Sequence, residues 1–119
     1  MTNKNIVSST LPMDMSRLKT VTDGKSSFQE ELLEMFFFNT KECIAVMERS
    51  CYDGVSPKWL DASEELKTTA DVLGAVELSK ICEVSKGIYD ANMLEKREML
   101  EIIKSNVNKV MVFVRNTRY

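Results

Sequence analysis

The small number and wide spacing of its turn-forming residues constrain the fold of this chain most strongly. Four glycines and two prolines are distributed over 119 residues. The stretches between them are long and carry apolar residues at three- and four-residue spacing, which is typical of amphipathic helices. A β-sandwich or β-barrel needs many more turns, and no stretch shows sustained alternation, so the sequence favours an all-α protein.

The apolar spacing and the turn residues together predict one short helix followed by four longer ones. In chain order, the predicted helices cover residues 12–22, 27–52, 57–73, 75–91 and 94–115. Ser26 is suited to cap the second helix, and Asp53-Gly54 is expected to end it. Pro57 fits the first position of the third helix, because its missing N–H costs nothing there. Gly74 permits the turn that follows.

Each long helix has an apolar stripe that must be buried, so the sequence predicts an up-down four-helix bundle with a short additional N-terminal helix. The length fits one domain, which we assign to residues 11–117. Residues 1–10 are polar and are predicted to form a flexible N-terminus. The residues expected to face inward on the first three helices are Met13, Met15, Leu18, Phe28, Leu32, Leu33, Phe36, Cys43, Val46, Met47, Trp59, Ala62, Leu66, Ala70 and Leu73.

The chain contains no histidine. This excludes His-ligated zinc, Ser–His and Cys–His nucleophile pairs and phosphohistidine chemistry. The carboxylates of the third predicted helix are Asp61, Glu64, Glu65 and Asp71. Because they are expected to face outward, neither a di-metal centre nor a glycosidase-like carboxylate pair is predicted. We therefore expect no enzyme activity, no metal and no cofactor.

Charge, cysteine usage and hydropathy indicate a soluble cytoplasmic protein. With 16 basic and 18 acidic residues, the chain has no basic field that would hold nucleic acid. Cys43, Cys51 and Cys82 form no CxxC motif and are expected to be buried thiols in a reducing compartment. The N-terminus lacks a signal-peptide pattern, and the longest apolar runs are too short to cross a bilayer, so no membrane association is predicted.

Two surface features leave alternatives open. Opposite the predicted core face of helix 57–73 lie Leu60, Glu64, Lys67, Thr68 and Asp71, with Glu64 near the middle. These residues form either an ordinary solvated face or, because Leu60 is large and apolar, part of a docking surface. Phe38 points away from the core face of its helix, so it either packs against the N-terminal helix or is exposed for docking.

The run from Ala62 to Ala75, ASEELKTTADVLGA, resembles the signature of histidine-containing phosphotransfer (HPt) domains, which reads approximately A-x-H-x-L-K-G-x-x-x-x-L-G-A. The upstream LLEMF stretch and Trp59 are also similar to the family, and the resemblance covers roughly residues 12–115. It implies a four-helix bundle with a short leading helix. The matching residues are Leu66, Lys67, Leu73, Gly74, Ala75, Leu78 and Cys82.

The sequence departs from the HPt signature at the residue that carries the chemistry. Glu64 occupies the place of the phospho-accepting histidine, and Thr68 replaces the glycine that leaves room beside the phosphoryl group. A carboxylate cannot pass a phosphoryl group on reversibly by the same route, so no catalytic residue is assigned. Lys67 resembles the basic residue that assists the phosphoryl oxygens. It also stands three residues after Glu64, where an intrahelical ion pair is worth about 0.2–0.5 kcal/mol.

The resemblance therefore implies a pseudo-HPt protein that binds the receiver domain of a response regulator or hybrid histidine kinase without carrying phosphate. Such a protein acts as a competitive inhibitor or an adaptor. Glu64 has about one negative charge against roughly two on a phosphoryl group, which makes it a poor mimic of the phosphorylated state. The residues expected to bind the partner are Phe38, Leu60, Glu64, Lys67, Thr68 and Asp71.

The alternative is a helical-bundle scaffold whose partner is unrelated to phosphorelays, because fold does not fix function. On that hypothesis the last helix supplies either core residues with one at the edge or a seam for a homodimer or partner. The sequence favours a monomer without deciding the oligomeric state. The residues in question are Val107, Val110, Met111, Phe113 and Val114.

Overall fold

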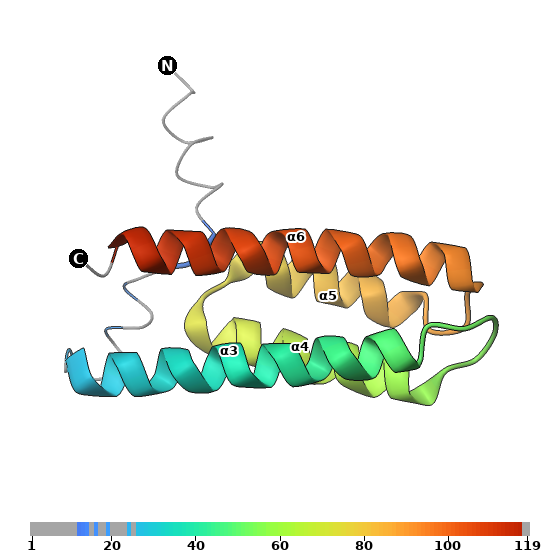
Figure 1. Cartoon of the computed structure of the whole chain (residues 1–119), viewed down its shortest axis with the longest axis horizontal. Helices are drawn as coiled ribbons and strands as arrows, with labels where there is room; N and C mark the ends of the chain where they lie inside the picture. Colours follow the sequence, from blue (N-terminus) through green and yellow to red (C-terminus); the bar gives the residue numbers. More distant parts are fainter. Residues whose placement is uncertain (1–11, 15, 17–18, 20–23, 25, 118–119) are drawn as a thin grey trace, which may run out of the picture.

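A computed structural model describes residues 12–14, 16, 19, 24 and 26–117 of the chain. Within this part there are four helices and no strand (Figure 1). This confirms the predicted all-α four-helix bundle. The helices are α3 (Ser26–Arg49), α4 (Pro57–Leu73), α5 (Val76–Gly87) and α6 (Met93–Thr117).

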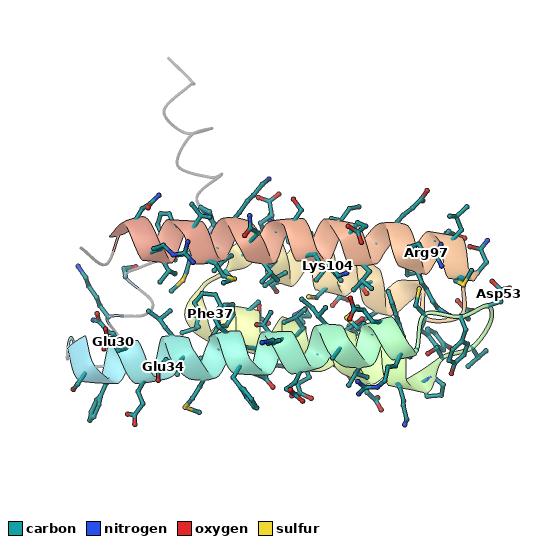
Figure 2. All side chains as sticks on the ribbon, in the orientation of Figure 1. Glu30, Glu34, Phe37, Asp53, Arg97 and Lys104 are labelled. Carbon is teal, nitrogen blue, oxygen red and sulfur yellow. The ribbon has the colours of Figure 1, made fainter. Side chains whose placement is uncertain are left out.

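The helices run alternately up and down, because the α3–α4 and α5–α6 loops lie at one end and the α4–α5 turn at the other (Figure 1). Helix α4 packs against α3 and α5, and α6 packs against α5 and α3. An ion pair between Lys104 Nζ and Glu48 Oε2, 2.7 Å apart, connects α6 to α3. Lys104 lies near the middle of α6 (Figure 2).

The two loops at that end are hydrogen-bonded to each other. Gly54 N donates to Ala91 O at 3.1 Å, and Ser56 N donates to Tyr89 O at 2.9 Å. Asp53, labelled at this end in Figure 2, accepts a 2.6 Å hydrogen bond on Oδ1 from the backbone N–H of Met93. The loops therefore act as one cross-connected unit.

This cross-connection accounts for two helix ends that differ from the prediction. Helix α3 ends at Arg49 instead of continuing to residue 52, and α5 ends at Gly87 instead of residue 91. In both cases the residues that leave the helix belong to the connected loops, so loop contacts replace further helical hydrogen bonds. Helix α6 extends the predicted range 94–115 by one residue at its start and two at its end.

Helix α4 begins and ends where the local sequence predicts. Ser56 Oγ accepts the backbone N–H of Trp59 at 3.3 Å, and Pro57 occupies the first turn. Gly74 has φ +74° and takes the left-handed conformation that glycine adopts at low cost after a helix. The bounds Pro57–Leu73 agree with the predicted helix.

The core lies between the four helices and contains most of the residues that the spacing predicts. Trp59, Ala62, Leu66, Ala70 and Leu73 are all buried. Leu32 and Val46 are only half-buried, and Phe28 is 50% exposed, so its assignment to the core was wrong. Helix α3 is seven residues longer than α4, about 10 Å, so its first turns extend past the helix against which they would pack.

The structure describes only part of the predicted short N-terminal helix. Met13 is buried, and the backbone N–H of Asp14 donates to Gly74 O at 2.9 Å, so residues 12–14 cover the α4–α5 turn. Met15, Leu18 and residues 1–10, which we expect to be flexible, lie outside the described residues. Among the described helices, none is both long and apolar enough to span a bilayer.

Candidate functional site

Glu64 lies near the middle of α4 on the side away from the core, as the helical spacing predicts. Its side chain is 61% exposed. The preceding residue, Ser63, is buried, and its Oγ is 2.7 Å from Ser85 Oγ on α5. Trp59, one turn earlier, donates from Nε1 to Ser85 O at 2.9 Å. These buried contacts fix the rotation of α4 against α5 and so hold residue 64 at the surface.

The ion-pair partner of Glu64 comes from α5. Lys86 Nζ is 3.3 Å from Glu64 Oε2 and 3.6 Å from Glu83 Oε1. The hydrogen bond to Glu64 raises the pKa of Lys86 above its usual value. A raised lysine pKa means that Lys86 stays charged up to about pH 10.5 and that its contribution is lost as the pH rises through the folded-state pKa. The negative charge of Glu64 is therefore offset by Lys86 at neutral pH.

Lys67 does not pair with Glu64, contrary to the intrahelical pair considered from the sequence. Its Nζ is 3.1 Å from Asp71 Oδ2, one turn further along α4. Asp71 Oδ1 also accepts a hydrogen bond from Ser79 Oγ on α5. The reason is geometric, since Asp71 lies at four-residue spacing from Lys67 and Lys86 reaches Glu64 from the neighbouring helix.

Thr68 and Leu60 complete the α4 part of the predicted surface. Thr68 is exposed, and its Oγ1 donates to Glu64 O at 3.1 Å. Its side chain thus occupies the helix surface one turn after Glu64. Leu60 is half-buried one turn before Glu64.

Phe38 is exposed, with 67% of its surface accessible. It lines an open, mainly apolar groove of about 600 Å³ between α3 and α4, which we call the apolar groove. Asn39 Nδ2 on α3 donates to Thr69 Oγ1 on α4 at 2.5 Å, so this hydrogen bond connects the two helices that border the groove. The groove is lined by Leu32, Glu34, Met35, Phe36, Phe38, Asn39, Thr68, Thr69, Val72 and Leu73.

Five of the six predicted partner-binding residues therefore divide into two adjoining areas, and the sixth, Leu60, is half-buried one turn before Glu64. Phe38 and Thr68 lie at the apolar groove, whereas Lys67 and Asp71 are paired with each other and Glu64 is tied to α5. Sequence reasoning did not identify Lys86 or the exposed groove residues Met35 and Val72. The unusual run of apolar residues 35–38 was a signal for the groove, whereas no pattern within α4 could have indicated Lys86.

The apolar residues of α6 are used mainly inside the bundle. Val107, Val110 and Val114 are buried, while Met111 and Phe113 are half-buried and pack against the core. The structure therefore agrees better with the prediction that these α6 residues belong to the core than with the prediction that they form a surface for a homodimer or partner. Phe37 on α3 lies on the side facing α6 (Figure 2) and contacts Phe36 edge to face, with ring centroids 5.0 Å apart.

The part of the chain that the structure describes holds no cluster of three or more histidine, cysteine or acidic side chains able to bind a metal ion. Of the three thiols, Cys43 and Cys82 are buried, and Cys51 is half-buried. Burial raises the pKa of both Cys43 and Cys82 to about 12, with nearby carboxylates adding to the shift. The expectation that the cysteines are buried thus holds for two of them.

We expect one thiol of the native protein to react readily with DTNB at pH 8. At four pH units below a pKa of about 12, only about one buried thiol in 10⁴ is ionised, so Cys43 and Cys82 should react only after unfolding. Measuring released thionitrobenzoate with and without guanidinium checks this. Cys51→Ser should remove the native reaction, and rapid reaction of two or more thiols in the folded protein contradicts the expectation.

Comparison of the chain with protein-family models, with curated proteins and with solved structures finds no match. The likeness to HPt domains therefore stays a prediction from the residues of the signature run.

Proposed function

We propose that this chain is a non-catalytic, HPt-like signalling protein that binds a receiver or histidine-kinase domain of a two-component phosphorelay without carrying phosphate. It acts there as a competitive inhibitor or an adaptor. The observation that carries the proposal is the exposed position of Glu64 at the middle of α4, at the place that matches the phospho-accepting histidine.

The chemistry of this position supports binding without phosphotransfer. Glu64 is held by Lys86, and Thr68 stands one turn away where the family signature has glycine. A carboxylate in an ion pair is a weak nucleophile, and the described part of the chain offers no histidine to replace it. The surface around Glu64 is therefore exposed for binding but lacks the histidine side chain that would carry phosphate.

The Lys86 contact also argues against Glu64 as a permanent mimic of a phosphorylated residue. A phosphoryl group carries nearly two negative charges, whereas the charge of Glu64 is already offset by an ammonium group 3.3 Å away. Binding through this surface therefore depends chiefly on its apolar residues, Leu60 and Phe38. Apolar anchors bordered by charged residues are the usual anatomy of a transient protein interface.

The direct test is a titration of the protein with isolated receiver domains from the organism that encodes it. We expect Phe38→Ala and Leu60→Ala each to weaken binding about tenfold, as loss of an apolar anchor does. Ile102→Ala, which truncates an exposed residue on α6, is the matched control and should leave affinity unchanged. Glu64→Ala should have a smaller effect than either apolar variant.

A second measurement tests the absence of phosphotransfer. Incubation with a radiolabelled phospho-receiver should leave no stable label on this chain. Stable label, or equal receiver affinity of the wild-type, Phe38→Ala and Leu60→Ala proteins, contradicts the proposal. Failure to bind any receiver would favour the alternative, a bundle scaffold with a partner unrelated to phosphorelays.

A further inference from the structure

We infer that the surface between α3 and α4, which we call the furrow, is a binding site for a basic amphipathic helix of another protein. The partner helix would carry large apolar residues about two turns away from lysines or arginines. This inference uses neither Glu64 nor the HPt resemblance and goes beyond the proposed function. It rests on two cavities that follow one another along the same pair of helices.

The first cavity is the apolar groove. Three of its side chains expose large apolar surface that no described residue covers, namely Met35 at 63%, Phe38 at 67% and Val72 at 43%. Contiguous exposed apolar surface of this kind is uncommon on a soluble bundle and marks an interaction site. No lysine or arginine of the described residues lines the groove, whereas Glu34 is one of the lining residues.

The second cavity, which we call the carboxylate pocket, has a volume of about 150 Å³. Its acidic residues are Glu42 on α3 and Asp61 and Glu65 on α4, and all three are exposed. None of them forms an ion pair with any residue that the structure describes, although Lys58 lines the same pocket. The pocket therefore carries an excess of negative charge.

The two cavities have a regular spacing. Met35 precedes Glu42 by seven residues on α3, and Glu65 precedes Val72 by seven on antiparallel α4. Seven residues correspond to about 10 Å along a helix, or two turns. A partner helix lying along the furrow would thus place apolar anchors in the apolar groove and basic residues in the carboxylate pocket.

Charge argues against the other occupants of such a surface. Anionic lipid and nucleic acid would be repelled by the unpaired carboxylates. A second copy packed about a two-fold axis through this face would place its carboxylates against either the same carboxylates or the apolar groove, and neither contact is favourable. A basic amphipathic helix would instead bury apolar side chains in the apolar groove and pair its positive charges with the carboxylates of the pocket.

Fluorescence anisotropy with a labelled synthetic helix of about 18 residues tests the inference. The probe carries Leu and Phe at positions i and i+4 and Lys or Arg at i+7, i+8 and i+11. We expect it to bind about tenfold or more tightly than the same peptide with glutamate at the basic positions, and more weakly as salt is raised. A scrambled peptide of the same composition should bind no better than the glutamate peptide.

Two sets of variants locate the binding. Glu42→Gln, Asp61→Asn and Glu65→Gln together should weaken the basic peptide about tenfold and reduce its salt dependence. Met35→Ser with Phe38→Ser should weaken both peptides. The matched control replaces exposed acids outside the furrow, Glu77→Gln, Asp90→Asn and Glu98→Gln, and should leave the affinity within about twofold.

The inference is overturned if the basic and glutamate peptides bind alike, if neither binds, or if the furrow and control variants behave the same. It is also overturned if the protein dimerises in sedimentation experiments and Met35→Ser with Phe38→Ser abolishes the dimer. Leu60→Ala separates this site from the proposed receiver surface, because it should weaken receivers and leave peptide affinity unchanged.

Discussion

Replacing Trp59 by alanine is expected to lower the free energy of unfolding by about 3–5 kcal/mol, the usual cost of removing a large buried aromatic side chain. Trp59 has no exposed surface, and its Nε1 donates to Ser85 O on the neighbouring helix at 2.9 Å. The change therefore leaves a cavity and removes one of the two hydrogen bonds that Ser85 O accepts, since the backbone N–H of Ile88 still donates to it at 3.2 Å. Since domains of this kind have a total stability of about 5–15 kcal/mol, a large part of the fold's stability would be lost.

Urea unfolding followed by circular dichroism measures this effect, because the variant lacks the only tryptophan of the chain. Trp59→Phe retains most of the apolar surface and should give an intermediate loss even if the alanine variant does not fold. Leu94→Ala, at an exposed position on α6, is the control and should change stability by no more than about 0.5 kcal/mol. A loss below about 1 kcal/mol for Trp59→Ala contradicts the central packing role of the indole.

Replacing Lys96 by methionine is expected to destabilise the protein by about 3 kcal/mol, because hydrogen bonds from a charged group contribute about 1.5–3 kcal/mol each and are partly compensated when lost together. Lys96 is fully buried, and its Nζ donates to Tyr52 O at 2.7 Å and to Gly54 O at 2.6 Å. The ammonium group also lies 5.3 Å from the centre of the Tyr52 ring. Methionine keeps the apolar stem but leaves both carbonyls without this donor.

Hydrogen exchange provides the site-specific readout for Lys96→Met. The amides of residues 50–56 should exchange faster in the variant under conditions in which the core of α4 remains protected. Lys80→Met, at an exposed position on α5, is the control and should alter neither stability nor exchange appreciably. Unchanged protection of the loop amides in Lys96→Met would show that other contacts hold this loop.

Features of the fold that depend on neighbouring residues could be predicted from the sequence. Pro57 and Gly74 mark the ends of α4 because a missing N–H and a positive φ are local properties. The ends of α3 and α5 could not be predicted in the same way. They depend on contacts such as Gly54 N to Ala91 O, between residues far apart in the chain. Lys96 is a similar case, since a lysine is rarely fully buried unless remote groups surround it.

In the candidate site too, features that depend on one helix could be predicted, whereas contacts between helices could not. The outward position of Glu64 follows from the helical repeat of α4 alone, and the structure places it at the surface. Its partner Lys86 and the apolar groove depend on how α5 and α3 lie beside α4, which periodicity does not specify. For Phe38 the sequence predicts either packing or exposure, because the spacing within one helix does not reveal what covers its flank.

The joined loops also determine how the bundle responds to mechanical tension. The beginning of α3 and the end of α6 lie at the same end of the molecule, opposite the loops (Figure 1). Force applied through these two points separates two antiparallel neighbours one turn at a time, as in unzipping, instead of shearing all their contacts at once. The hydrogen-bonded loops with Lys96 lie furthest from the applied load and are the last part to be pulled open.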